Sequence, residues 1–228
     1  MLSNRVQTIE AVKFVARALG DLNEQVVFVG GAVAGLYVDD PGAPEVRPTK
    51  DVDIVLEIKS LSRLEELRKA LAARDIHPAS EEKVMCRFKY QNIFLDIMST
   101  HEVGWAPANP WFKDGFAKPE IYSFDHLSIR ILQVAFYLAS KFTAFEERGA
   151  DPRTSHDFED IVFILDNRAT LINDVKQAEK DVRAFLVHKF NTILEDSSLQ
   201  EAILSHLEPA TQTRRFEMLI QKLKEITK

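Results

Sequence analysis

The sequence of 228 residues contains a single cysteine and no long apolar run, and these two absences exclude whole classes of protein. A single cysteine, Cys86, cannot form a disulfide within the chain, which fits a reducing compartment. No stretch approaches the roughly 18 apolar residues that a transmembrane helix needs. The N-terminal residues carry Glu10, Lys13 and Arg17 on an amphipathic pattern, unlike a signal peptide. We therefore expect no association with membranes and a location in the cytoplasm.

The chain also lacks an excess of positive charge. It has 29 Lys and Arg against 35 Asp and Glu, which gives a formal net charge of -6. This balance argues against nonspecific nucleic-acid binding through global charge, although it permits a local basic patch. The composition, 46% hydrophobic and 28% charged, is ordinary for a soluble globular protein. The apolar surroundings of Cys86 indicate a buried strand residue rather than a nucleophile.

Two aspartates, Asp51 and Asp53, are the most informative feature present. They lie at the start of the apolar run 51–58, which is typical of a buried strand. Because alternate side chains of a strand point to the same face, the two carboxylates would project side by side. Neighbouring carboxylates repel each other and are costly to desolvate. A divalent cation resolves that conflict, so the pair indicates a magnesium or manganese site.

The remaining pattern predicts a mixed first half and a helical second half, divided near residue 122. In the first half we expect a helix over 4–19, a strand over 26–29, a short helix over 32–37, a loop over 39–48, and a helix over 62–73 opened by Ser62 and Glu65. Two strands over 84–90 and 93–98 would be joined by a tight turn, and 101–119 would be irregular. In the second half we expect helices over 126–148, 154–166, 170–190, 197–206 and 212–226. This order predicts a domain over 1–122 and a helical domain over 123–228.

A glycine pair and a third aspartate accompany the two carboxylates. Gly30 and Gly31 follow the first strand, where glycine lets the backbone approach a phosphate closely. Asp96 lies in the strand 93–98 and is a third candidate metal ligand, an ordinary edge-strand charge being the alternative. Lys50, directly before the strand 51–58, is a candidate for contact with the nucleotide, a solvated charge being the alternative. Three carboxylates beside a phosphate cradle suit two-metal phosphoryl or nucleotidyl transfer, in which one ion activates the attacking oxygen and the other stabilises the leaving pyrophosphate.

These residues resemble a known superfamily. The segments Val29-Gly-Gly-Ala-Val33 and Thr49-Lys-Asp-Val-Asp-Ile-Val-Leu-Glu57 are similar to the signature of nucleotidyltransferases related to DNA polymerase β. Leu138-Ala-Ser-Lys141-Phe-Thr-Ala144 and the Asp157-x-x-Asp160 pair are similar to the later motifs of the AbiEii/AbiGii-type nucleotidyltransferase toxins. The resemblance covers roughly residues 26–166. It implies an α+β fold, with a minimal polymerase β-like mixed sheet, flanking helices and a C-terminal helical domain.

The resemblance also implies roles for residues of the second half. Lys141 would hold the nucleotide triphosphate and Asp157 would support catalysis, with Asp160 as the less certain choice. The physical alternatives are a lysine that snorkels at the end of an apolar helix and charges on a helix surface.

We therefore expect a nucleotidyltransferase that uses Mg²⁺ or Mn²⁺ and moves an NMP from an NTP to an acceptor hydroxyl. Asp51, Asp53 and Asp96 would bind metal, and Gly30, Gly31, Lys50 and Lys141 would bind the nucleotide. The active site is expected between the two halves. The acceptor could be a tRNA, a protein or a small molecule, and the toxin resemblance favours tRNA or protein and adds a cognate antitoxin. The alternative is a noncatalytic module that keeps the fold and binds a nucleotide or a partner.

Overall fold

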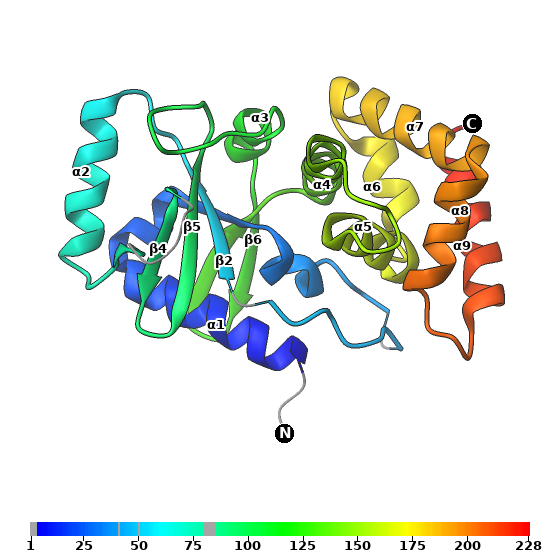
Figure 1. Ribbon diagram of the computed structural model, residues 1–228, viewed down its shortest axis with the longest axis horizontal. Helices are drawn as coiled ribbons and strands as arrows, with labels where there is room; N and C mark the ends of the chain where they lie inside the picture. The colour runs from blue at the N-terminus through cyan, green and yellow to red at the C-terminus, as the bar shows by residue number, and fades with distance from the viewer. Residues whose placement is uncertain (1–3, 41, 50, 80–84) are drawn as a thin grey trace. The chain divides into compact units, whose positions relative to one another are not determined.

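The chain forms two compact units in the computed structural model, which describes residues 4–40, 42–49, 51–79 and 85–228 (Figure 1). The first, here called the sheet unit, consists of Met1–Gly35 and Arg47–Gln133. The second, here called the helical unit, consists of Leu36–Val46 and Val134–Lys228. Within the described residues, no helix combines the length and the apolar character needed to cross a bilayer. Whether residues 1–122 and 123–228 fold as separate domains stays a prediction.

A seven-stranded mixed sheet organises the sheet unit, as expected for an α+β fold, with strand order β3-β4-β5-β2-β1-β7-β6 (Figure 1). β2 is parallel to β5 and β1 is parallel to β7, while the other neighbouring strands are antiparallel. β1 is wholly apolar and buried, which is typical of a strand covered on both faces, and β2 is apolar except for Asp51 and Asp53. The strands are β1 (Val26–Val29), β2 (Asp51–Leu56), β3 (His77–Pro78), β4 (Arg87–Tyr90), β5 (Ile93–Ser99), β6 (Glu120–Phe124) and β7 (Leu127–Ile131).

Helices complete the sheet unit. They are α1 (Asn4–Leu19), η1 (Gly20–Gln25), η2 (Gly31–Leu36), α2 (Leu61–Ala72) and α3 (Phe112–Ala117). α1 buries a stripe that includes Thr8, Val12, Val15 and Leu19, because residues three to four apart share one helix face. Figure 1 shows α1 lying along the sheet. The predicted helix 4–19 and the predicted strand 26–29 are confirmed.

The predicted helix from His126 is wrong over its first third, because a hairpin stands there. β6 and β7 pair in antiparallel register, with Phe124 opposite Leu127 across a two-residue turn. Asp125 in that turn has φ of 47°, which aspartate tolerates better than most residues. Apolar residues alternate with polar ones from Leu127 to Ile131, the period of a strand. The helix begins only at Val134 and then runs to Arg148 as predicted.

Smaller corrections concern the ends and types of other elements. The segment after Gly30 is a 3-10 helix, and α3 forms inside the region expected to be irregular. Ser60, not Ser62, caps α2, because its hydroxyl accepts the backbone N–H of Arg63 at 3.2 Å. The helix predicted over 170–190 is two helices, since Ala178 has extended backbone with ψ of 158°.

The helical unit is built around α4 (Val134–Arg148). Nearly every residue from Val134 to Phe142 is buried, as in a helix that other helices surround on all sides. Against it pack α5 (His156–Asn167), α6 (Leu171–Gln177) and α7 (Lys180–Glu195), while α8 (Ser197–His206) packs on α5 and α7, and α9 (Gln212–Ile226) packs on α5, α6 and α7. The last two helices have the bounds that the sequence predicts.

The segment between η2 and β2 belongs to the helical unit although it lies inside the first half of the sequence. Arg168 donates to the backbone oxygen of Tyr37 at 2.8 Å, and the backbone N–H of Ala169 donates to Asp39 at 2.7 Å. Arg215 of α9 is paired with Asp40 at 3.2 Å. The backbone N–H of Gly42 lowers the pKa of Asp40 most, and the guanidinium of Arg215 lowers it further. Residues 36–46 are thus held by both hydrogen bonds and charge.

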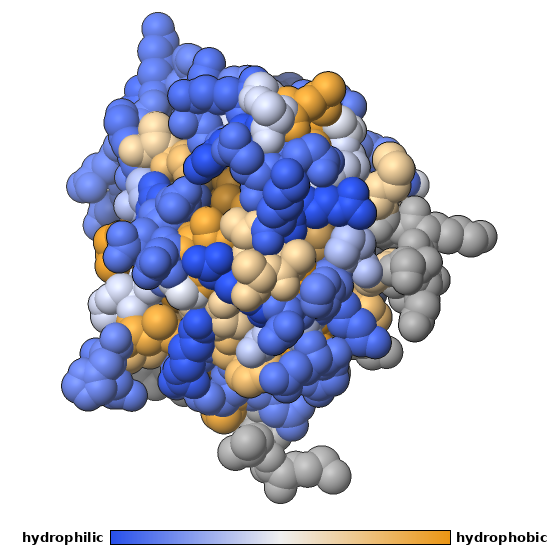
Figure 2. Space-filling view, turned by 90° about the vertical axis from the view of Figure 1, so that its left-hand side faces the viewer, coloured by the Kyte–Doolittle hydropathy of each residue, from blue (hydrophilic) through white to orange (hydrophobic). Residues whose placement is uncertain are grey.

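The face of the molecule in Figure 2 is mostly hydrophilic. Hydrophobic side chains gather in a small group near its centre and not in a continuous band. Figure 2 looks onto the side of the sheet unit that carries α2, whose buried residues are Leu64, Leu67 and Leu71. Such a surface is ordinary for a protein in water.

Candidate active site

The predicted strand carrying Asp51 and Asp53 is β2, and its neighbours bring a third aspartate to it. Asp53 lies directly opposite Asp96 in the parallel pairing of β2 with β5. Adjacent strands are about 4.8 Å apart, so these two residues are neighbours in space. Asp51, two residues before Asp53, shares its face of the strand. The structure therefore groups the three carboxylates that the sequence singled out.

Gly30 makes room for one of these carboxylates. It follows β1 with φ of +71°, a conformation that side chains rarely adopt. A Cβ built at this position would lie 1.8 Å from Oδ2 of Asp53. Glycine is thus required here because the backbone passes directly beside the Asp53 carboxylate. Its contact with a phosphate, like that of Gly31 at the start of η2, stays a prediction.

Asp51 is held by two donors. The Thr49 hydroxyl donates to its Oδ1 at 2.8 Å, and Nη2 of Arg87 donates to its Oδ2 at 3.0 Å. The Asp51 side chain is 33% exposed, so a ligand can still reach it. Thr49 and Arg87 thus fix the orientation of the Asp51 carboxylate.

Arg87 is the central cation of this cluster. It lies opposite Asp96 in the antiparallel pairing of β4 with β5. Its Nε donates to Asp96 Oδ1 at 2.8 Å and its Nη2 donates to Asp96 Oδ2 at 2.7 Å, a bidentate pair. The same Nη2 bonds Asp51, so one nitrogen joins two carboxylates on two strands. The guanidinium also lies over Phe94, with Cζ 5.2 Å from the ring centroid.

The donor set suits a hard cation, yet its present arrangement does not form a metal cage. Carboxylate oxygens are the ligands that Mg²⁺ prefers. In the part of the chain that the structure describes, no group of three or more His, Cys, Asp and Glu is arranged to hold an ion. Arg87 gives the physical reason, since its guanidinium occupies the oxygens of Asp51 and Asp96. The charge of these two carboxylates is therefore already partly neutralised by a cation of the protein itself.

A second charged cluster lies in the helical unit and contains the other predicted residues. Asp157 and Asp160 lie one turn apart on α5, so they face the same side. Nζ of Lys141, on α4, lies 3.1 Å from Asp157 Oδ1 and 2.7 Å from Asp160 Oδ2. Arg148, at the end of α4, is also paired with Asp157. The structure thus joins Lys141, Asp157 and Asp160 in one ion-pair cluster.

This second cluster is buried, which distinguishes it from a surface salt bridge. The side chain of Lys141 is 10% exposed, and those of Asp157 and Asp160 are each 5% exposed. Desolvation of such charges is expensive, and apolar residues of similar volume are often as stable. The alternative of a lysine that merely snorkels to solvent does not fit this burial. Ser155 caps α5 by accepting the N–H of Phe158 at 3.3 Å, which fixes the first turn that carries Asp157.

Two other predictions have different outcomes. Lys50 lies outside the described residues, so its contact with nucleotide stays a prediction. Cys86 is buried in the sheet unit, as expected, but it lies in a turn directly before β4 and not in a strand. Burial raises the pKa of its thiol, and the negative charge of Asp96 raises it further. The thiol is therefore held protonated at neutral pH and is a poor nucleophile.

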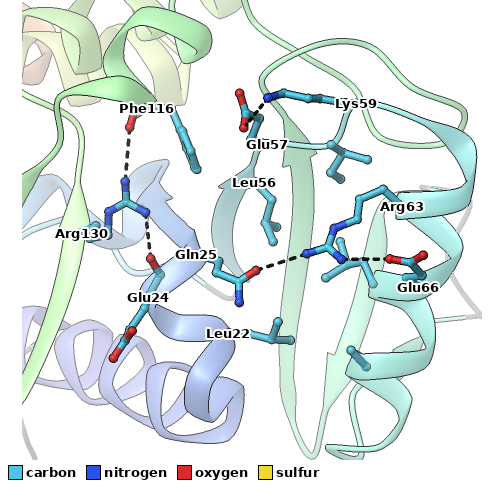
Figure 3. A pocket seen from close by; sticks show the side chains of 13 residues that line it. Leu22, Glu24, Gln25, Leu56, Glu57, Lys59, Arg63, Glu66, Phe116 and Arg130 are labelled. Carbon is cyan, nitrogen blue, oxygen red and sulfur yellow. Dashed lines mark hydrogen bonds and ion pairs between the residues drawn. The ribbon is translucent and has the colours of Figure 1, made fainter.

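The cavity drawn in Figure 3 lies away from the carboxylates. It has a volume of about 650 Å³ and is lined by Leu56 at the far end of β2, about 16 Å along the strand from Asp51. Figure 3 shows that most of its charged side chains already have partners in the protein. Arg63 is bonded to Gln25 and Glu66, Arg130 to backbone oxygens of Glu24 and Phe116, and Lys59 to Glu57. We place the candidate active site at the carboxylates.

Arg87 and Thr49 are the site residues that the sequence analysis missed. A turn centred on Gln91 and Asn92 pairs Tyr90 with Ile93, and counting back from it pairs Arg87 with Asp96. The predicted hairpin therefore contained the signal for Arg87. Thr49 could have been found from its position two residues before Asp51, since threonine hydroxyls often bond such neighbours.

Comparisons with known proteins concern the family and the fold of the chain. The chain matches, over residues 13–225, the family model described as nucleotidyl transferase AbiEii toxin, type IV TA system. It resembles the crystal structure of an antigenic nucleotidyltransferase-like protein from Paracoccidioides brasiliensis, with a TM-score of 0.50 and 15% identity over 90% of this chain and 97% of the other. A solution structure of the antibiotic-resistance factor ANT(2'')-Ia matches with a TM-score of 0.48 and 13% identity over 83% and 95% of the two chains. No curated protein matches the sequence.

Proposed function

The chain belongs to the AbiEii nucleotidyltransferase toxin family, and from this premise we propose that it is a metal-dependent enzyme that transfers an NMP from an NTP to an acceptor hydroxyl. The observation that carries the proposal is the grouping of Asp51, Asp53 and Asp96 on adjacent parallel strands, with a cation already held by two of them. A guanidinium bound by these oxygens is a stand-in for a metal ion, because both are cations that bind carboxylate oxygens.

Each residue of the carboxylate cluster has a role in this proposal. Asp51 and Asp53 would bind Mg²⁺ or Mn²⁺, and Asp96 would join them. When bound, the metal would supply Lewis-acid stabilisation of charge on the phosphates and the leaving pyrophosphate. The acceptor oxygen forms a bond to the α-phosphorus while the bond to pyrophosphate breaks. The hydroxyl proton goes to a carboxylate of the cluster, for which Asp96 is our candidate.

Lys141 and Asp157 keep their predicted roles as part of the proposal. A lysine is a compact point charge with three donors, which suits a triphosphate. Support comes from the burial of the cluster, since buried ion pairs contribute little net stability and often mark functional positions. Gly30, Gly31 and Lys50 are proposed to contact the nucleotide.

The partners follow from the family. Its description as a toxin of a type IV toxin-antitoxin system suggests an antitoxin partner and a nucleotide substrate. We propose a tRNA or a protein as the acceptor. Incubation with each α-labelled NTP, Mg²⁺ and total cell extract would identify the fraction that becomes labelled.

Asp53→Asn is expected to abolish this transfer. The substitution keeps the size of the side chain but removes the charge that lies between Gly30 and Asp96. Losing one group that stabilises charge in a transition state costs roughly 10²–10³ in rate, so we expect at least about a hundredfold loss. The measurement is the initial rate of label transfer at saturating Mg²⁺.

Asp114→Asn is the matched control, because it makes the same change at an exposed position of α3. It should leave the rate within about twofold, as surface substitutions usually do. Equal rates in the wild type and Asp53→Asn would refute the proposed chemistry. Absence of transfer with every NTP, together with NTP binding that needs no metal, would identify a noncatalytic module instead.

A further inference from the structure

Arg87 occupies the position between two carboxylates that the proposed function assigns to metal. Its Nη2 lies 3.0 Å from Asp51 Oδ2 and 2.7 Å from Asp96 Oδ2. A magnesium ion that bridged the same oxygens would lie about 2.1 Å from each of them. One nitrogen and one ion cannot occupy the same space between two oxygens. Arg87 and a bridging metal are therefore mutually exclusive.

The charge of Arg87 cannot be removed by a change of pH. A guanidinium stays protonated in proteins, so the only way for it to leave the carboxylates is to move. Its side chain is 19% exposed and that of Asp96 is 14% exposed, so the pair is partly desolvated. Partial desolvation strengthens the attraction relative to a surface pair. Any ion that enters must compete with this attraction.

Phe94 gives the guanidinium a second contact that does not involve the carboxylates. The ring centroid lies 5.2 Å from Cζ of Arg87, within the range of a cation-π interaction. Lys89, two residues further along β4, lies 5.8 Å from the same centroid. Both cations thus share the aromatic ring, but Arg87 also bridges Asp51 and Asp96.

We propose that Arg87 is a resident counter-cation of the carboxylate cluster, which stabilises the metal-free protein and competes with the divalent cation. Arg87 is a positioning residue in this account, since it acts through Asp51 and Asp96. Its departure from Asp51 is coupled to metal entry. The inference rests on the proposed function in one respect only, the binding of metal by these carboxylates.

The test is a titration of the full-length protein with Mn²⁺, followed by calorimetry, for the wild type, Arg87→Gln and Lys89→Gln. Removal of a competing charge a few ångströms from the ion should tighten binding, and we expect the Kd of Arg87→Gln to fall about tenfold. Lys89→Gln is the control. It removes one positive charge from the same strand, near the same ring, but leaves the bonds of Arg87 to Asp51 and Asp96 in place. Its Kd should stay within about twofold of the wild-type value.

Thermal unfolding supplies a second readout that does not depend on activity. In EDTA, Arg87→Gln should unfold at a lower temperature than the wild type, because Asp51 and Asp96 lose their shared cation. Saturating Mn²⁺ should raise the unfolding temperature of Arg87→Gln by more than that of the wild type. If Arg87→Gln does not fold, Arg87→Lys takes its place. A lysine lacks the planar fork that holds both carboxylates, so Kd should fall severalfold.

The outcomes distinguish failure of this inference from failure of the function on which it rests. Tighter Mn²⁺ binding by Arg87→Gln alone supports the inference, and so does binding by Arg87→Gln with none by the wild type. Equal or weaker binding by Arg87→Gln, or equal tightening by both variants, overturns the inference and leaves metal binding standing. Absence of Mn²⁺ binding by all three proteins overturns both the inference and the proposed metal dependence.

Discussion

Lys141→Met is expected to lower the free energy of unfolding by about 3–5 kcal/mol, the usual cost of removing one partner from a buried ion pair. Lys141 lies within 3.1 Å of Asp157 and 2.7 Å of Asp160, whose side chains are each 5% exposed. Methionine fills a similar volume, so the loss comes from charge and not from a cavity. Asp160 would then be a buried carboxylate without this cation. Urea unfolding followed by circular dichroism measures the change.

Two further variants show whether charge is the cause. Arg148 is also paired with Asp157, but its side chain is 68% exposed, so Arg148→Gln should cost only about 1 kcal/mol or less. Adding Asp160→Asn to Lys141→Met removes the carboxylate that lost its partner and should restore part of the stability. A cost below about 1 kcal/mol for Lys141→Met would show that the cluster contributes little to the fold.

Gly30→Ala is expected to damage both stability and activity. A Cβ at this position would lie 1.8 Å from Asp53 Oδ2, a separation that no pair of nonbonded atoms tolerates. Either the carboxylate or the backbone after β1 must move. The φ of +71° adds about 1–2 kcal/mol of strain for a residue with a Cβ. We expect a loss of more than about 2 kcal/mol of stability and at least a hundredfold loss of transfer activity, as for Asp53→Asn.

Gly20→Ala is a control that separates the effect of backbone strain from the effect of a steric clash with Asp53. Gly20 also has positive φ, +55°, but the nearest atom to its built Cβ is Nε of Arg74 at 3.8 Å. Gly20→Ala should therefore carry only the backbone strain and keep full transfer activity. The comparison uses initial rates and urea unfolding of both variants. Similar activity of Gly30→Ala and the wild type would mean that the position of the Asp53 carboxylate is not critical.

The carboxylate cluster could be predicted because it depends on local periodicity. Alternation on β2 places Asp51 and Asp53 on one face, and a strand with Asp96 follows later in the chain. The register that puts Asp96 opposite Asp53 depends on the pairing of β2 with β5, which no local pattern specifies. Arg87 was missed although the hairpin register contained it, because the segment around it was interpreted only through its apolar residues.

Other features lay beyond a local pattern. The segment 127–131 was predicted to be helical as part of a helix over 126–148, while its strand conformation depends on pairing with β6 and β1. The packing of residues 36–46 in the helical unit rests on contacts with Asn167, Arg168 and Arg215, more than 120 positions away. Side chains so distant in sequence leave no periodic signal.

Metal-dependent nucleotide binding is the central claim, and calorimetric titration with each NTP tests it most directly. The titration is carried out with and without Mg²⁺ on the wild type and on Asp51→Asn/Asp53→Asn. We predict binding of at least one NTP by the wild type only when Mg²⁺ is present, and no binding by the double variant. Binding of equal strength without Mg²⁺ and in the double variant would contradict the account, and would assign the chain to nucleotide recognition without catalysis.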